Sequence, residues 1–224
     1  MRPRSITTLA FGCALLLCLS SRASAQIFDL SSGGAPTITG ARGGSVRGSA
    51  SVLNDLTVTI NFGEVSPLNS NSIVKVVVPI AIRSLLPYQV TATLTSSSNA
   101  DPQAVQNSDI GFGINNLRVM GNKAQVCSNH TFRAPFNNDP SSGVTLNGNG
   151  RATYPSSLNN VGLSTVLLSG PTLTKINGQN GQRLTNDGYI FDAIFTITPQ
   201  YYSSGNFSLT ITFNIAVGPI VLCT

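Results

Sequence analysis

The feature that most constrains this chain is a period of two in its apolar residues. Near the C-terminal end, apolar side chains alternate with Ser, Thr or Asn over Phe207, Leu209, Ile211, Phe213 and Ile215. Successive side chains of a β-strand point to opposite faces, so this pattern predicts a strand with one buried and one solvated face. Signals for helices are almost absent after residue 25.

The same alternation recurs in residues 56–62, 88–94 and 189–197. Turn-forming residues 199–206 join the last of these to the C-terminal pattern, which predicts a long antiparallel hairpin. Residues 73–82 are apolar at nearly every position, as expected of a strand covered on both faces. Pro79 lies inside this run and cannot donate a ladder hydrogen bond, which predicts an edge, a bulge or a strand end there.

The middle of the chain carries weaker signals. Ile110 to Ile114 predicts a short strand that a turn at Asn115-Asn116 ends, and residues 161–168 predict another strand. Residues 128–160 have the composition of a long loop with one or two short strands. About eight strands separated by turns predict an all-β fold, an antiparallel β-sandwich with Ig-like, Greek-key-like connections.

The first 25 residues have the pattern of a cleaved export signal. Arg2 and Arg4 precede an uncharged apolar run, Leu9 to Leu19, and Ala23-Ser24-Ala25 supplies small residues for cleavage between Ala25 and Gln26. The apolar run is too short for a permanent membrane helix. We therefore expect a secreted, extracellular or periplasmic protein, retained at the cell surface in a structural role, and the composition is typical of bacteria.

This interpretation divides the chain into three parts. Residues 1–25 are the signal peptide, residues 26–50 a flexible Gly/Ser-rich N-terminal arm, and residues 51–224 a single β-sandwich domain. Removal of Arg2, Arg4 and Arg22 leaves ten of the 13 basic residues against eight acidic ones, a charge of +2. The remaining basic residues are scattered singly, so no nucleic-acid partner is expected.

Two cysteines remain after the signal, Cys127 and Cys223. In an oxidising compartment two cysteines of one domain are expected to pair. The alternative is two reduced, buried thiols. A disulfide between them would close a loop of nearly a hundred residues, which the chain-entropy model values at roughly 4–5 kcal/mol.

Residues that could carry catalysis are few, and we expect no enzyme and no cofactor. His130 is the only histidine, and its polar neighbours predict a solvated loop histidine. A remote alternative is a secreted hydrolase that uses His130 or a carboxylate pair. The mature chain has eight acidic residues, among them Glu64 and Asp192, and the sequence does not indicate which of them would pair. Metal-ligand spacings are absent, and Asn137-Asn138-Asp139 matches no calcium-loop pattern.

Two features favour binding. Tyr201 and Tyr202 in the expected hairpin loop, with Asn206 after them, form a candidate ligand site, because tyrosines beside amides stack on sugars and hydrogen-bond them. This predicts a carbohydrate-binding module as the alternative function, with glycans as partners. The chain is also rich in Asn, Ser and Thr, which suits a neutral adhesive surface.

A short stretch resembles a known group of proteins. Asn61-Phe-Gly-Glu-Val-Ser-Pro67, a strand, and then Ser84-Leu-Leu-Pro-Tyr-Gln-Val90 look like the opening of spore coat protein U-like and fimbrial subunit domains. The likeness covers residues 56–95 and implies an Ig-like fold and a role in surface fibres or coats. Together with the signal, it favours an exported non-enzymatic subunit that binds itself or other surface subunits through a sheet edge.

Overall fold

The computed structural model describes residues 27–40, 45–49, 54–65, 73–97, 104–120, 129–148, 151–172, 188–198 and 205–221. The expected signal peptide and its cleavage site, Ala25 and Gln26, lie outside these residues, as do both candidate disulfide cysteines, Cys127 and Cys223.

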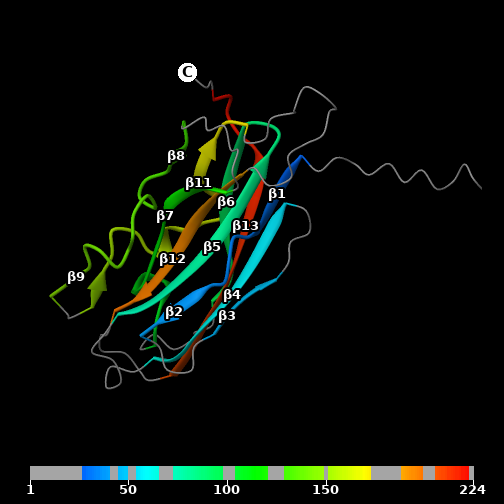
Figure 1. Ribbon diagram of the computed structural model, residues 1–224. Coiled ribbons are helices and arrows are strands. Elements are labelled where there is room, and N and C mark those ends of the chain that lie inside the picture. The colour runs from blue at the N-terminus through cyan, green and yellow to red at the C-terminus, as the bar shows by residue number, and fades with distance from the viewer. Residues whose placement is uncertain are drawn as a thin grey trace, which may run out of the picture.

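Two antiparallel sheets pack face to face, which confirms the predicted all-β sandwich (Figure 1). Sheet A has the order β1-β5-β12-β7, with β2 also on β5; its strands are β1 (Phe28–Ser32), β2 (Thr37–Thr39), β5 (Val74–Ser84), β7 (Ile110–Met120) and β12 (Gly188–Ile197). Sheet B has the order β3-β4-β13-β6-β11-β8; its strands are β3 (Ser45–Ser49), β4 (Asp55–Val65), β6 (Tyr88–Ser97), β8 (Thr131–Phe132), β11 (Thr165–Gly170) and β13 (Gly205–Val217). A separate pair is formed by β9 (Thr145–Leu146) and β10 (Ala152–Thr153), and two 3₁₀ turns are η1 (Asn107–Asp109) and η2 (Leu158–Asn160).

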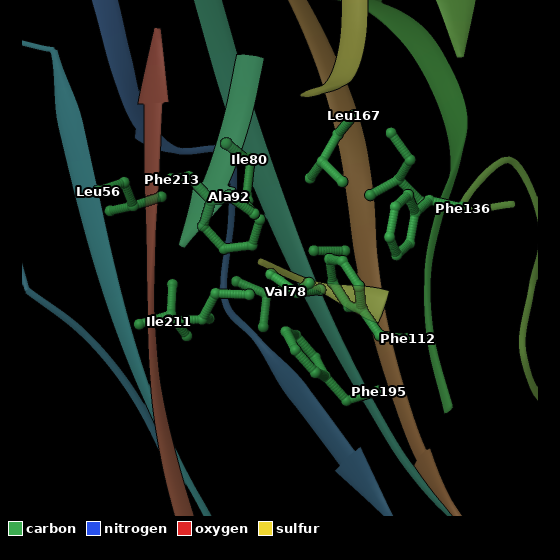
Figure 2. Close-up of a cluster of buried hydrophobic side chains, with 14 of the residues drawn as sticks. Leu56, Val78, Ile80, Ala92, Phe112, Phe136, Leu167, Phe195, Ile211 and Phe213 are labelled. Atoms are coloured by element: carbon green, nitrogen blue, oxygen red, sulfur yellow. The ribbon is translucent and has the colours of Figure 1, made fainter. Parts of the chain in front are cut away.

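The alternating apolar residues fill the space between the sheets (Figure 2). Val78 and Ile80 of sheet A face Ile211 and Phe213 of sheet B in this layer. All five alternating apolar residues of β13 are at most 2% exposed. Burial of this many aliphatic and aromatic side chains is the main stabilising contribution to such a fold.

The expected hairpin between residues 189–197 and 207–215 is wrong. Both strands form, but β12 pairs with β5 and β7 in sheet A, whereas β13 pairs with β4 and β6 in sheet B. The chain therefore crosses between the layers after β12. Alternation specifies which face of a strand is buried and carries no information about its neighbours, so two consecutive strands can belong to different sheets.

The expected turn at Asn115-Asn116 is also wrong, because β7 runs through it. The register against β12 shifts there: Ile190 pairs with Arg118, and Asp192 pairs with Asn115. Asn116 has a φ of 56°, and asparagine tolerates this left-handed conformation better than most residues. The Asn pair thus marks a β-bulge inside one long strand.

The arm expected over residues 26–50 is a third difference, because its described parts form β1, β2 and β3. Phe28 and Leu30 are buried, and Ile38 and Val46 pack against the core. This segment has too few apolar residues to fold alone, as its composition indicates. It is ordered because its strands pair with the edges of the two sheets.

Candidate functional site: the sheet edges of the N-terminal segment

One side of the sandwich is built by the N-terminal segment. β1 and β2 lie one after the other along β5 at the edge of sheet A, and β3 then pairs with β4 at the edge of sheet B. β2 and β3 also contact each other. The segment therefore passes from one layer to the other and forms both sheet edges on this side (Figure 1).

Pro79 explains why two short strands lie beside β5 instead of one long strand. The Gly33 N–H donates to the Pro79 carbonyl at 2.8 Å, but Pro79 has no N–H to donate in return. β1 ends at Ser32, and the register along β5 has shifted by two residues where β2 begins. The predicted irregularity at Pro79 is thus a break in the partner strand, while Pro79 itself lies within β5.

Gly33 suits the same point because there is little space for a side chain beside β5. A Cβ at Gly33 would lie 2.9 Å from Ile190 Cγ2 and 3.1 Å from the Ala81 nitrogen. A contact of 2.9 Å would force Ile190 to shift, and one of 3.1 Å to a backbone atom is tighter than most Cβ contacts.

The hydrogen-bonding direction of this edge follows from two bonds. Gly33 N–H donates to the Pro79 carbonyl and Leu85 N–H donates to the Ile27 carbonyl, so odd-numbered residues of β5 bond toward β1 and β2. In an antiparallel ladder only alternate residues bond to a given neighbour. The backbone N–H and C=O groups of Asp29 and Ser31 therefore point toward β5. Those of Phe28, Leu30, Ser32 and Ile38 point away from β5.

Phe28 and Leu30 are buried, so the accessible part of this edge is at Ser32 and Ile38. No strand lies beside it, or beside the outer side of β3, among the residues that the structure describes. Ser32 is exposed at the end of β1, and Arg47 is exposed on β3. An edge of this kind presents unpaired N–H and C=O groups to any strand that can lie beside it.

The opposite edge of sheet A is covered by the chain itself. Ile114 N–H donates to the Phe136 carbonyl at 2.7 Å, and Phe112 N–H donates to the Ser156 carbonyl at 3.1 Å. The Phe136 ring packs on Phe112 with 5.5 Å between ring centroids, so the cover also contributes to the core (Figure 2). The long loop expected over residues 128–160 therefore covers the edge of β7 in its described part.

An ion pair ties this cap to the outer face of sheet A. Lys75 of β5 donates to the carboxylate of Asp139, which also accepts hydrogen bonds from the backbone and side chain of Ser141. Partial burial alone would raise the pKa of Asp139, but the hydrogen bonds from Lys75 and Ser141 outweigh it and lower the pKa below its ordinary value. This carboxylate is therefore structural.

His130 differs from the expected solvated loop histidine. Its Nδ1 lies 2.9 Å from the Tyr88 hydroxyl, and its ring centroid is 4.4 Å from that of Tyr189. Tyr88 belongs to sheet B and Tyr189 to sheet A, so His130 joins the two layers at one end of the sandwich. Burial and the neighbouring Tyr189 raise the pKa of Tyr88, which keeps this phenol protonated.

Gly170, which lies beside His130, leaves space for these contacts because it has no side chain. A Cβ at Gly170 would lie 2.4 Å from His130 Nδ1 and 2.8 Å from the Tyr88 hydroxyl. The position of His130 depends on partners 40 and more residues away in the chain, which is why its local sequence could not indicate it.

The two candidate carboxylates are not brought together by the sheets. Glu64 lies on β4 in sheet B, where it pairs with Asn206, and Asp192 lies on β12 in sheet A. Asp192 accepts hydrogen bonds from Asn116 Nδ2 at 2.6 Å and from Arg118 Nη1 at 2.9 Å. Its carboxylate therefore holds the bulge of β7 in place.

The candidate sugar-binding tyrosines, Tyr201 and Tyr202, lie outside the described residues, and Asn206 is placed by its backbone pairing alone. Among the described residues, no group of three or more His, Cys, Asp or Glu side chains is arranged to hold a metal ion. In the same part of the chain no helix has the length and apolar character needed to cross a bilayer.

Comparisons of the chain with family models, with curated proteins and with solved structures give no match.

Proposed function

We propose that this protein is an exported, non-enzymatic structural or adhesive subunit of a surface coat or fibre. Copies assemble when a strand of one copy adds to the sheet edges that β1, β2 and β3 form in another. The observation that carries the proposal is the contrast between the two edges of sheet A: the carbonyls of Phe136 and Ser156 cap β7, whereas no described strand lies beside the exposed Ser32 of β1 or beside β2.

Physical reasoning favours strand addition at such an edge. A row of outward N–H and C=O groups gives main-chain hydrogen bonds to an added strand, and exposed edges are protected in most proteins that stay monomeric. The outer face of sheet B supports a role in contact with other neutral surfaces. Its threonines pair across strands, as in Thr57 with Thr212 at 3.1 Å and Thr59 with Thr210 at 3.3 Å, which makes a neutral, hydroxyl-rich face.

The test removes one outward donor from the edge. Ser32→Pro deletes the N–H that faces away from β5 and places a ring on the free edge, so we expect assembly to weaken about tenfold or more while the fold is kept. Sedimentation velocity and negative-stain electron microscopy of the exported protein measure the assembly, and thermal unfolding measures the fold.

Two matched variants separate the effects. Ser32→Ala removes the hydrogen bond from the Ser32 hydroxyl to the Gly34 carbonyl but keeps the backbone donor, so assembly is retained. Ser31→Pro deletes a donor that faces β5, so the free energy of unfolding falls by about 1–3 kcal/mol. A protein that is strictly monomeric at every concentration, or that assembles equally well with Ser32→Pro, would refute the proposal.

A further inference from the structure

Sheet B carries hydroxyl groups on the outer face of three adjacent strands, β4, β13 and β6 (Figure 1). Each strand has threonines two residues apart, and the apolar residue between them packs in the core or against it. The outward residues are Thr57, Thr59 and Asn61 on β4, Ser208, Thr210 and Thr212 on β13, and Thr93 and Thr95 on β6. We call these residues the hydroxyl face.

The strand register sets the hydroxyl face in rows. Between β4 and β13, Thr57 pairs with Thr212 and Thr59 pairs with Thr210. Thr212 also pairs with Thr93 of β6. Neighbouring strands lie roughly 4.8 Å apart, and residues i and i+2 of one strand lie roughly 6.7 Å apart. The hydroxyl face is therefore an array that repeats in two directions.

The threonine hydroxyls of this array also bond to one another. The Thr212 hydroxyl lies 3.1 Å from that of Thr57 and 3.1 Å from that of Thr95, so one chain of hydroxyls links the three strands. In the next row the hydroxyls of Thr59 and Thr210 lie 3.3 Å apart. A hydroxyl has one donor and two acceptor sites, and Thr59 and Thr95 are exposed, so their remaining sites face solvent. Because β-branched side chains are stiff at χ1, the array is ordered before a ligand arrives.

The chemistry of the hydroxyl face restricts what it can bind. It has no charged and no aromatic side chain, so it offers neither an opposite charge to an ion nor a ring on which a sugar could stack. A hydrogen bond to a dissolved ligand gains little, because it replaces one to water. The ligand that complements an uncharged, periodic array of donors and acceptors is itself an uncharged, periodic array of hydroxyl groups. The surface of an ice crystal has this chemistry, and its oxygen atoms repeat at intervals close to those of the array.

We propose that the hydroxyl face binds ice. Its threonine hydroxyls bond to water molecules of the crystal surface, and the strand ladders and stiff rotamers reduce the entropy lost when they do so. This inference goes beyond the proposed strand addition and uses a different surface. Assembly uses the edges formed by β1, β2 and β3, whereas ice contacts the outer face of sheet B.

The test measures adsorption of the fluorescently labelled exported protein to a single ice crystal that grows in buffer. We expect the protein to cover defined crystal planes. Thr210→Lys places a long charged side chain in the middle of the hydroxyl face, so we expect adsorption to fall at least tenfold. The control is Thr153→Lys, the same change at an exposed threonine of β10, outside both sheets, which leaves adsorption unchanged.

A second variant covers the case in which lysine disturbs folding. Thr59→Tyr keeps a residue that favours strands but raises a ring above the array, so it should also reduce adsorption at least tenfold. Thermal unfolding compares the fold of each variant with that of the wild type.

Several results would overturn this inference. They are a wild-type protein that the growing crystal excludes, and equal adsorption by the wild type, Thr210→Lys and Thr59→Tyr. Binding to crystalline cellulose that both variants lose, without adsorption of the wild type to ice, would also overturn it, because the face would then bind a glycan. Ser32→Pro leaves the hydroxyl face intact and should adsorb to ice even when it does not assemble, so the two proposals fail separately.

Discussion

At the scale of single residues, the contact of His130 with Tyr88 and Tyr189 is possible because Gly170 has no side chain. Gly170→Ala places a methyl group against His130 Nδ1 and the Tyr88 ring, so we expect a loss of about 1–3 kcal/mol in the free energy of unfolding. For a domain of this size 1 kcal/mol lowers the melting temperature by about 2–4 °C, which calorimetry resolves. Gly148→Ala is the control, because no atom lies within 4 Å of its added Cβ. Equal melting temperatures for the two variants would contradict this packing.

The ion pair of Asp139 with Lys75 predicts a dependence of stability on pH. Because folding lowers the pKa of Asp139, its contribution is present above the pKa of the unfolded chain, about 3.8, and is lost as pH falls through the folded value. Asp139→Asn should lower the free energy of unfolding by about 1 kcal/mol at pH 7, and the difference from the wild type should shrink toward pH 2. Urea unfolding at both pH values measures this, and a difference that grows on acidification would show that the pKa is raised instead.

At the scale of elements, β1 is an integral strand of sheet A. Leu30 is fully buried, so Leu30→Ala should cost about 2–5 kcal/mol in the free energy of unfolding. Ile27→Ala, three residues earlier and half exposed, should cost less than about 0.5 kcal/mol. Denaturant titration compares the two. If Leu30→Ala has no more effect than Ile27→Ala, the segment is the flexible arm that its Gly/Ser-rich composition predicts.

The same elements show what sequence can and cannot predict here. The strands of residues 56–62, 88–94, 189–197 and 207–215 are confirmed, because period-two burial is a local property. Other features depend on distant partners, so the local pattern could not indicate them. They are the sheet to which each strand belongs, the bulge at Asn116, the formation of β1 and β2 as strands, and the contacts of His130. Pro79 is intermediate: its missing N–H predicts an irregularity, and the structure locates that irregularity in the neighbouring strand.

At the scale of the whole molecule, the expected disulfide between Cys127 and Cys223 remains a prediction. Cys127 lies three residues before His130 in the sequence, and Cys223 lies five residues after Gly218. His130 is hydrogen-bonded to Tyr88, and Gly218 is hydrogen-bonded to Pro87, the residue before Tyr88. Reduction should therefore remove up to roughly 4–5 kcal/mol of stability. Non-reducing mass spectrometry of the exported protein decides the pairing, and two alkylatable thiols would refute it.

The proposed strand addition distinguishes the two edges of sheet A. An added strand would lie beside β1 and β2, whereas the carbonyls of Phe136 and Ser156 already bond the amides of β7 and would prevent addition there.

The most direct test of this account is hydrogen–deuterium exchange of the exported protein, compared between dilute and assembled samples. We predict that the amides of Ser32 and Ile38 exchange rapidly in the dilute protein and become protected on assembly, while those of Phe112 and Ile114, already bonded to the cap, are equally protected in both. Assembly that leaves the amides of Ser32 and Ile38 unprotected, or that changes only the amides of β7, would contradict the central claim.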